Sequence, residues 1–328
     1  MTAVPTSLLI RDDLIPPIKE QAAQAGWKAG IYSFGKAEME KVDYFNPSLV
    51  ERPDGTWLIV RRSVFEDRLR FGRNDIMAFK LEENRPLYGR KVKIPFMQEG
   101  EQFEDPRAVY WQEKTWIGAC NFVWHGKTWT GAHQILAECD DSWIAQVRHD
   151  PIYGKNGGGI GQNHGHEKNW VWFVHKNKMH MIYQGPPEQV ILKFDTMSRP
   201  TDIIPGPRED VPWGHGIIRG GTPPVLVNGE YWTFFHSSTE WKPPYRRYFM
   251  GAYAFENKPP FRVTKITPQA LLIGNQHDYW QPRKPLVVFP CGALLRGDKW
   301  LVTLGVNDLK CGFVEIPHED LEIVAEEI

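Results

Sequence analysis

An aspartate beside a proline is the residue of this chain whose position best suits acid–base chemistry. It lies in the string Phe103-Glu104-Asp105-Pro106-Arg107, where the proline fixes the entry into a strand and donates no backbone hydrogen bond. A carboxyl group in a dry pocket lined by aromatic side chains has a raised pKa, so Asp105 could protonate the oxygen of a leaving group. The alternative is that Asp105 forms an ion pair with Arg107 or caps a turn.

Polar side chains of several kinds recur at the starts of the strands that the sequence predicts and in the segments that follow. A packed β fold needs no charged groups there, and buried charge is costly unless it is paired or functional. Because a hydroxyl group both donates and accepts hydrogen bonds, a mixture of carboxylates, amides and cations suits a polyhydroxylated ligand. The candidate residues are Asn46, Arg61, Asp105, Asn121, Lys168, Asn169, Arg219, His236, Tyr248 and Asp308.

A degenerate repeat of five copies explains why such residues recur. Each copy begins with a polar residue and a small residue or proline, continues as an apolar run, turns, and returns as a second strand that is often rich in Trp. A period of roughly 55–65 residues built from short strands is typical of a β-propeller, in which the inner strands converge on a central axis. The first strands begin at 46–50, 105–109, 168–172, 221–225 and 289–293, and the second strands at 57–60, 116–119, 179–182, 231–234 and 300–303.

The repeat predicts an all-β fold: a five-bladed β-propeller in a single domain with a short N-terminal helical segment. Residues 1–40 would form a capping segment, with a helix around 17–24 that stops near Gly26. Residues 41–328 would form the catalytic propeller domain, and 317–328 could add a short tail helix.

The composition argues against several classes of partner. The 328 residues carry a net charge of −1, so we expect no nucleic-acid partner and no membrane partner. The four cysteines have neither Cys-x-x-Cys nor zinc-finger spacing, which predicts reduced, buried thiols. The N-terminus lacks a basic start followed by an apolar core, so a cytoplasmic protein is expected, and a homo-oligomer is left open.

Three further signals fit a structural explanation better than a functional one. His164-x-His166 has no carboxylate or cysteine at a recognised ligand spacing, so no metal is predicted. The glycine-rich segment 157–161 is not followed by the Lys-Ser/Thr pair of a phosphate-binding loop. Arg246-Arg247 fits a solvated loop better than a nucleic-acid patch. No cofactor is predicted, although inorganic phosphate could be a co-substrate.

Taken in order, the short motifs of the chain resemble glycoside hydrolase family 130, which contains β-mannoside phosphorylases and β-1,2-mannosidases, and a poorly characterised group of related propellers. The resemblance implies a five-bladed propeller and a carbohydrate-active enzyme. The matching motifs are Phe45-Asn46, Glu104-Asp105-Pro106-Arg107, Cys120-Asn121, Lys168-Asn169, Gly220-Gly221-Thr222-Pro223-Pro224, His236, Tyr248-Phe249-Met250-Gly251, Phe289-Pro290-Cys291-Gly292 and Gly305-Val306-Asn307-Asp308.

The resemblance also implies roles for these residues. Asp105 would be the catalytic acid, acting with inversion. The residues that would contact the sugar at the cleavage point are Asn46, Arg61, Asn121 and Asp308. The residues that would hold phosphate or another acceptor are Lys168, Asn169, Arg219, His236 and Tyr248.

Two departures from the family pattern bear on the acceptor. Phosphorolytic members have an Arg where this chain has Gln184, and Ile217 stands in place of a Lys, although Arg219 could substitute because it lies two residues further along a strand. Losing a bidentate Arg weakens phosphate binding, so a glycosidase that uses water is favoured over a glycoside phosphorylase. The bases considered for hydrolysis are Glu167 and Glu240.

Several alternatives stay open at this stage. They are a mannoside phosphorylase, a glycosyltransferase that uses an activated mannosyl donor, and a non-catalytic carbohydrate-binding propeller. Furanosidase propellers share the Asp-Pro motif, but their plan needs an acidic residue where this chain has Asn46, which can act neither as base nor as nucleophile.

Overall fold

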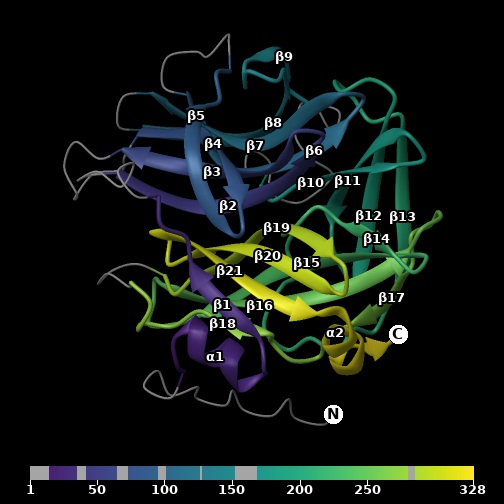
Figure 1. Cartoon of the computed structure of the whole chain (residues 1–328). Coiled ribbons are helices and arrows are strands. Elements are labelled where there is room, and N and C mark those ends of the chain that lie inside the picture. Colours follow the sequence, from purple (N-terminus) through teal and green to yellow (C-terminus); the bar gives the residue numbers. More distant parts are fainter. Residues whose placement is uncertain are drawn as a thin grey trace.

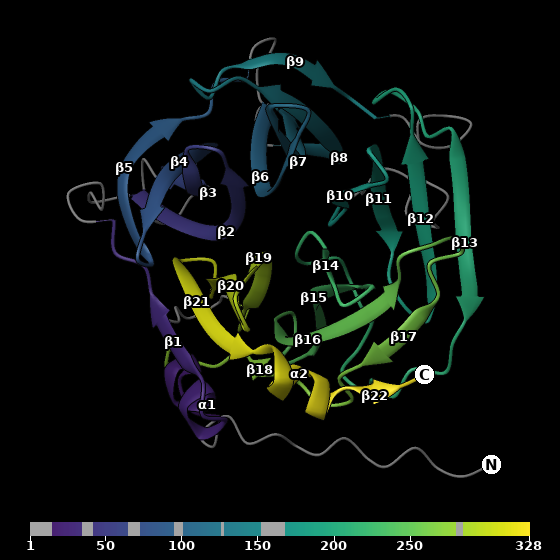
Figure 2. The ribbon, with the colours of Figure 1, turned by 45° about the vertical axis from the view of Figure 1, so that its right-hand side comes forward.

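Five antiparallel sheets surround a common axis, which confirms the predicted single-domain, five-bladed β-propeller (Figures 1 and 2). The computed structural model describes residues 15–34, 42–64, 73–94, 101–125, 128–151, 168–279 and 285–328. In each of the five predicted repeats, the first and second strands are hydrogen-bonded neighbours in the same sheet. None of the helices in these ranges is long and apolar enough to span a membrane.

Each sheet begins with its inner strand and continues outward (Figure 2). The first sheet contains β2 (Val42–Arg52), β3 (Gly55–Val64), β4 (Arg73–Glu82) and β5 (Arg85–Lys91). The second contains β6 (Glu101–Trp111), β7 (Lys114–His125), β8 (Thr128–Cys139) and β9 (Ala145–His149). The third contains β10 (Val171–His175), β11 (Lys178–Gln184), β12 (Glu188–Phe194) and β13 (Asp202–Arg208). The fourth contains β14 (Val225–Val227), β15 (Glu230–Glu240), β16 (Arg246–Glu256), β17 (Val263–Ile266) and β22 (Glu326–Glu327), with β18 (Leu272–Ile273) paired to β16. The fifth contains β19 (Val288–Arg296), β20 (Lys299–Val306), β21 (Lys310–Pro317) and β1 (Lys28–Ile31).

Strands from both ends of the chain close the ring. β1 pairs with β21, with Lys28 opposite Glu315, so the fifth sheet combines N-terminal and C-terminal strands. β22 returns to the fourth sheet and pairs with β17. Closing a ring of sheets in this way protects their edges. β1 lies before the predicted boundary at residue 40 and pairs within the fifth sheet.

The two short helices lie where the sequence predicted them. α1 (Ile18–Gln24) follows Pro17, carries Glu20 in its first turn, and buries Ile18 and Ala22, which are one turn apart on the same face. The chain leaves this helix through Gly26, whose φ of +78° is costly for other residues. α2 (His318–Val324) occupies most of the predicted tail helix, and the chain then extends into β22.

Apolar clusters fill the spaces between neighbouring sheets, and many tryptophans are part of them. The second and third sheets show how closely they pack. An added Cβ on Gly118 would lie 2.4 Å from the ring of Trp172, so the glycine makes room for the indole. The buried tryptophans of the repeat include Trp57, Trp116, Trp170, Trp172, Trp232 and Trp300. These tryptophans therefore stabilise the packing of the blades.

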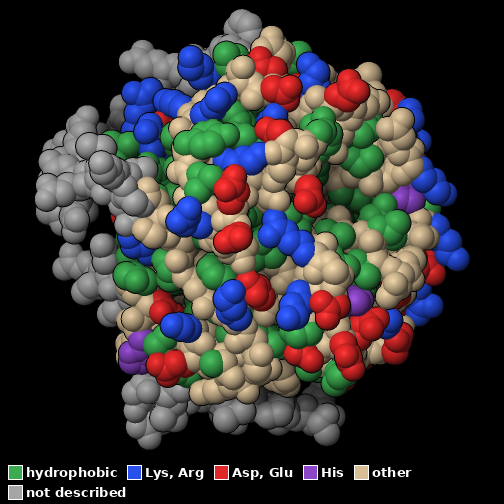
Figure 3. Space-filling model, viewed as in Figure 1, with side chains coloured by type: hydrophobic (Ala, Val, Ile, Leu, Met, Phe, Trp, Pro, Cys, Tyr) green, Lys and Arg blue, Asp and Glu red, His purple; other side chains and the backbone are tan. Residues whose placement is uncertain are grey.

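The antiparallel pairing brings the start of each inner strand to the end of the second strand. One end of the ring therefore collects residues that are far apart in sequence. The pairs at this end include Phe45 with Arg61, Glu104 with Cys120, Val171 with Ile182, Arg219 with His236, and Val288 with Val306. On the face in Figure 3, acidic and basic side chains are interspersed, in agreement with the net charge of −1.

Candidate active site

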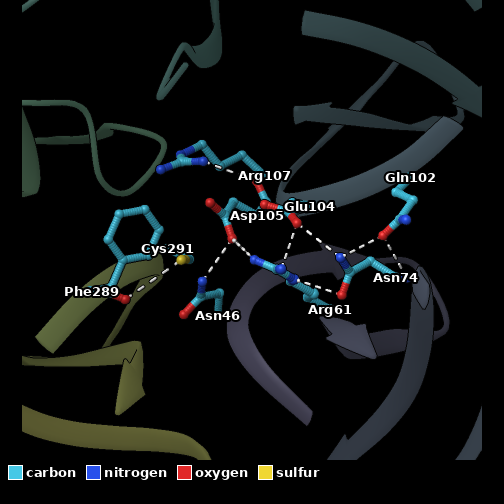
Figure 4. Close-up of polar contacts among 9 residues, drawn as sticks. All are labelled: Asn46, Arg61, Asn74, Gln102, Glu104, Asp105, Arg107, Phe289 and Cys291. Atoms are coloured by element: carbon cyan, nitrogen blue, oxygen red, sulfur yellow. Dashed lines mark hydrogen bonds and ion pairs between the residues drawn. The ribbon is translucent and has the colours of Figure 1, made fainter. Parts of the chain in front are cut away.

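Matching β-bulges in the first two blades turn Asn46 and Asp105 toward each other. In each inner strand one extra residue is inserted between the flanking pairs, and the bulged residue has a left-handed φ, +50° at Asn46 and +52° at Asp105. Asn and Asp tolerate this conformation better than most residues, and the proline that follows each of them has no N–H to leave unpaired. The Asn46 side-chain amide donates a hydrogen bond of 2.7 Å to Asp105 Oδ1 (Figure 4).

A glycine in the fifth blade makes room for Asn46. A Cβ added to Gly305 would lie only 1.7 Å from Asn46 Oδ1 and 3.2 Å from the Asn46 backbone nitrogen. Asn46 itself is buried, with 3% of its surface exposed, so its amide has little room to move. The three blades that carry Asn46, Asp105 and Gly305 therefore fix the carboxylate together.

Arg61 is the cation that contacts the carboxylates of this cluster. It donates hydrogen bonds to Asp105 Oδ1 (3.4 Å), to Glu104 Oε1 (2.5 Å) and to the third partner, Asn74 Oδ1 (3.2 Å). Its guanidinium also lies 4.5 Å from the centre of the Phe45 ring. These contacts fix the Arg61 side chain, and one of its nitrogens points at Asp105 (Figure 4).

Arg107, the alternative partner of Asp105 in the sequence, binds backbone carbonyls instead. It donates to the backbone oxygens of Asp105 (2.9 Å), Gly221 (2.8 Å) and Gly220 (3.4 Å). Since the glycines precede the inner strand of the fourth blade, Arg107 connects the second and fourth blades. An Asp105–Arg107 ion pair is therefore not the explanation for the motif.

The electrostatic surroundings of Asp105 correct one expectation. Burial alone raises the pKa of Asp105, but the Arg61 charge, the Asn46 hydrogen bond, and the Arg107 and Lys168 charges together outweigh it. The pKa of Asp105 is therefore lowered, whereas the sequence suggested that it would be raised. The side chain is 18% exposed, so it reaches solvent as a carboxylate.

Glu104 is a second carboxylate in the cluster, and the sequence analysis gave it no role. Burial raises its pKa to about 7; Asp105 adds to this effect, while Arg61 opposes it. In a regular strand, neighbours point to opposite faces, so Glu104 and Asp105 were not expected to share a partner. The bulge between 104 and 107 removes that alternation.

His236, Tyr248 and Arg219 lie together in the fourth blade. The Arg219 backbone pairs with that of His236, and the His236 ring stacks on Tyr248 with centroids 5.7 Å apart. Burial, reinforced by Arg107 and Arg219, lowers the pKa of His236 to about 3, so this imidazole is neutral. Burial raises the pKa of Tyr248 to about 12, and Asp308 contributes next. These three residues therefore offer neutral donors and acceptors beside one cation.

Two exposed cations face this end of the propeller. Lys168 Nζ lies 4.1 Å from the centre of the Phe122 ring, and its charge acts on Glu104 and Asp105. Among the residues that the structure describes, no carboxylate forms an ion pair with Lys168 or Arg219. Both cations are therefore available to an anionic group.

Asn169 and Asp308 have left-handed backbone conformations at the same end. Asn169 has a φ of +63° two residues before β10, and Asp308 has a φ of +52° in the turn between β20 and β21. The charge of Asp308 acts on Arg61, which places it within electrostatic reach of the carboxylate cluster. Left-handed residues other than glycine occur often at functional sites, because packing must hold them there.

Other candidates make contacts within their own blades or fall outside the described residues. Asn121 is completely buried, and its side-chain amide donates to Glu101 Oε1 (2.6 Å) and contacts His133. The Gln184 amide is exposed and donates to the Glu188 backbone oxygen at 2.9 Å, within its own hairpin. Glu240 is exposed at the end of β15. Glu167, the His164-x-His166 pair and the segment 157–161 fall outside the described residues.

The cysteines and the His175–His180 pair are explained by packing and hydrogen bonding. All four cysteines are buried and form no disulfide, as the sequence predicted. Within the described ranges, no group of three or more His, Cys, Asp and Glu side chains is arranged to hold a metal ion. His175 lies beside His180, but its ring contacts the Tyr231 hydroxyl at 3.1 Å, so hydrogen bonding accounts for its position.

Comparisons with known proteins agree with the propeller fold. A sequence model of the glycoside hydrolase 130 family, described as beta-1,4-mannooligosaccharide phosphorylase, matches residues 165–326. A search of curated proteins gave no match. Among solved structures, a β-1,2-mannobiose phosphorylase from Listeria innocua is 17% identical with a TM-score of 0.64, and the match covers 87% of this chain and 93% of that one.

Two proteins from Leishmania mexicana are similar in fold. A GDP-Man-dependent mannosyltransferase is 12% identical with a TM-score of 0.60, covering 88% of this chain and 90% of that one. A mannose phosphorylase in complex with phosphate is 12% identical with a TM-score of 0.59, covering 94% and 95%. The resemblance seen in the sequence motifs is confirmed by the family model and by the shared architecture.

Proposed function

We propose that this chain, a carbohydrate-active enzyme related to glycoside hydrolase family 130, makes or breaks a β-mannoside-like bond by exchanging a proton at Asp105. The observation that carries the proposal is the fixed carboxylate at the bulge of β6. Asn46 and Arg61 hold Asp105 Oδ1 from the neighbouring blade at 2.7 and 3.4 Å, and the side chain stays 18% exposed. A group held this firmly can meet a glycosidic oxygen in one defined geometry.

The lowered pKa of Asp105 means that this side chain is ionised before a substrate binds. In the synthetic direction, an ionised Asp105 can accept the proton of an acceptor hydroxyl. In the cleavage direction Asp105 must first carry a proton. A sugar ring that displaces the remaining water raises the pKa of the carboxyl, because burial already has the largest single effect on it. Asn46, Arg61 and Asp308 would contact the sugar at the cleavage point.

For the acceptor, we favour water or a sugar hydroxyl over phosphate, with inversion at the anomeric carbon. Gln184 stands where phosphorolytic relatives have an Arg, and its amide is bonded to the Glu188 carbonyl of its own hairpin. An amide can donate a hydrogen bond to phosphate but cannot neutralise its charge. Hydrolysis is therefore the first candidate.

A second candidate rests on the two exposed cations. Lys168 and Arg219 have no carboxylate partner among the described residues, and together with Asn169, His236 and Tyr248 they could bind an anion. The anion would be inorganic phosphate in a mannoside phosphorylase, or the phosphate of an activated mannosyl donor in a transferase. In a phosphorylase, inorganic phosphate would be a co-substrate.

One set of reactions separates these functions. The protein is incubated with β-1,2- and β-1,4-mannobiose, with and without phosphate, and separately with mannose plus mannose 1-phosphate or GDP-mannose. Proton NMR follows the first product and its anomeric configuration. Release of mannose without phosphate supports hydrolysis, and phosphate-dependent release of mannose 1-phosphate supports phosphorolysis. A mannoside product that forms with GDP-mannose but not with mannose 1-phosphate supports transfer. If the sugars bind but none of these reactions proceeds, the chain is a carbohydrate-binding propeller and the proposal is wrong.

A further inference from the structure

Glu104 is the carboxylate in the cluster that the proposed reaction leaves without a role. Its Oε1 atom accepts a hydrogen bond from Arg61 (2.5 Å) and another from the Asn74 amide (2.8 Å). Asn74 Oδ1 in turn accepts from Arg61 Nε at 3.2 Å, which closes a ring of three side chains (Figure 4). The Gln102 side-chain oxygen accepts a further bond from Asn74 at 2.9 Å and fixes that amide.

We infer that Glu104 is a positioning residue of the active site, which aims Arg61 at Asp105 and shares the charge of that guanidinium with it. The inference rests on the proposed role of Asp105. Two of the three nitrogens of Arg61 are committed to the ring, so the third can only point along one direction, toward Asp105 Oδ1. A guanidinium is planar, so fixing two nitrogens fixes the third.

The negative charge of Glu104 does more than complete this ring. A glutamine has the same shape and could accept the same two hydrogen bonds, and a buried carboxylate is costly to retain. When Glu104 is ionised, the positive charge of Arg61 interacts with two carboxylates. When Glu104 is protonated, Asp105 is the one ionised carboxylate that contacts Arg61 among the described residues. The charge of Glu104 therefore changes how strongly Arg61 holds Asp105 in its ionised form.

The groups that face Glu104 come from several elements. They are Arg61 on β3, the neighbouring Asp105, Lys168 before β10 and Asp308 after β20, and the Cys120 thiol on β7 lies opposite in the strand pair. Burial is the largest influence and raises the pKa of Glu104 to about 7, while the pKa of Asp105 is lowered. Glu104 therefore titrates in the neutral range, where Asp105 is already ionised.

Carboxyl NMR of the full chain tests this coupling without any need for turnover. Aspartate is labelled with ¹³C at Cγ, and the Asp105 signal is assigned by its absence in Asp105→Asn. Because Glu104 and Asp105 interact through Arg61, the Asp105 signal of the wild type should shift a second time near pH 7. In Glu104→Gln that second step should disappear. In the matched control Glu230→Gln, whose carboxylate pairs with Lys265 at 2.9 Å, it should persist.

An Asp105 signal with a single step in the wild type overturns the inference, and so does a step near pH 7 that survives in Glu104→Gln. The wild-type titration decides the matter even if the variant fails to fold. Failure of the proposed function looks different: no mannoside reaction is seen, while the two-step titration is intact. A purely structural Glu104 would lower the melting temperature on substitution and leave the Asp105 titration unchanged.

Discussion

Substituting Gly305 by alanine should disturb the site through one atom of Asn46. The new Cβ would lie 1.7 Å from Asn46 Oδ1, about half of an ordinary carbon–oxygen contact of roughly 3.5 Å. The amide must therefore move by about 1.5 Å or more. A hydrogen bond of 2.7 Å to Asp105 cannot survive such a displacement, because it would then exceed the usual hydrogen-bond range.

The size of the effect follows from the charge of the acceptor. A hydrogen bond to a charged group is worth about 1.5–3 kcal/mol. Since this bond favours the ionised form of Asp105, losing it should raise the pKa of Asp105. The pKa of Asp105 should rise because the hydrogen bond from Asn46 helps to hold it below its usual value.

A double-mutant cycle with Asn46→Ala shows whether the effect passes through the amide. The Asp105 pKa is measured by carboxyl NMR in both single variants and in the pair. Gly305→Ala should change little once Asn46 is already alanine, so the two effects should not add. Gly214→Ala is the matched control, because an added Cβ there meets nothing within 4 Å. Additive shifts, or an unchanged Asp105 pKa in Gly305→Ala, would refute the reasoning.

Three further outcomes follow from the site and the blade packing. Asp105→Asn should lower turnover by at least about 100-fold with an unchanged circular dichroism spectrum, and near-wild-type turnover would remove Asp105 from the chemistry. Lys168→Ala and Arg219→Ala should each weaken phosphate binding in calorimetry, and Gln184→Arg should strengthen it by about 10-fold or more; no change in all three would mean that this pocket is not an anion site. Gly118→Ala should lower the thermal midpoint by several degrees, because the new Cβ would lie 2.4 Å from a buried indole; an unchanged midpoint would show that the blades can separate to admit it.

The architecture could be predicted because its signals are local. Each blade repeats an apolar run, a turn and a second strand within a few dozen residues, and pairing within a hairpin follows from that pattern. The Asn-Pro and Asp-Pro pairs also carry local information. A proline after a residue that tolerates left-handed φ is compatible with a β-bulge, and Asn46 and Asp105 both lie at bulges within their inner strands β2 and β6.

The electrostatics could not be predicted in the same way. The pKa of Asp105 depends on partners 59 and 44 positions away along the chain, and the sequence does not show that Asn46 and Arg61 converge on it. The contact of Glu104 with Asn74 is equally remote, and regular alternation along β6 gives no sign that Glu104 and Asp105 both contact Arg61. The hydrogen bond of Asn121 to Glu101 of its own blade is a further contact that the sequence does not show. Contacts between blades decide these details, and the repeat alone does not encode them.

The division of the site between blades explains how one scaffold can serve several acceptors. Asp105, the carboxylate proposed to exchange the proton, lies in the second blade and is held by Asn46 and Arg61 of the first, with Gly305 of the fifth supporting Asn46. The exposed cations come from elsewhere, Lys168 from the start of the third blade and Arg219 from the fourth. Substitutions on the acceptor side can therefore change which group is bound without displacing Asp105. For this reason the uncharged Gln184 bears on the choice between water, phosphate and a sugar acceptor, whereas the proposed chemistry at Asp105 is compatible with all three.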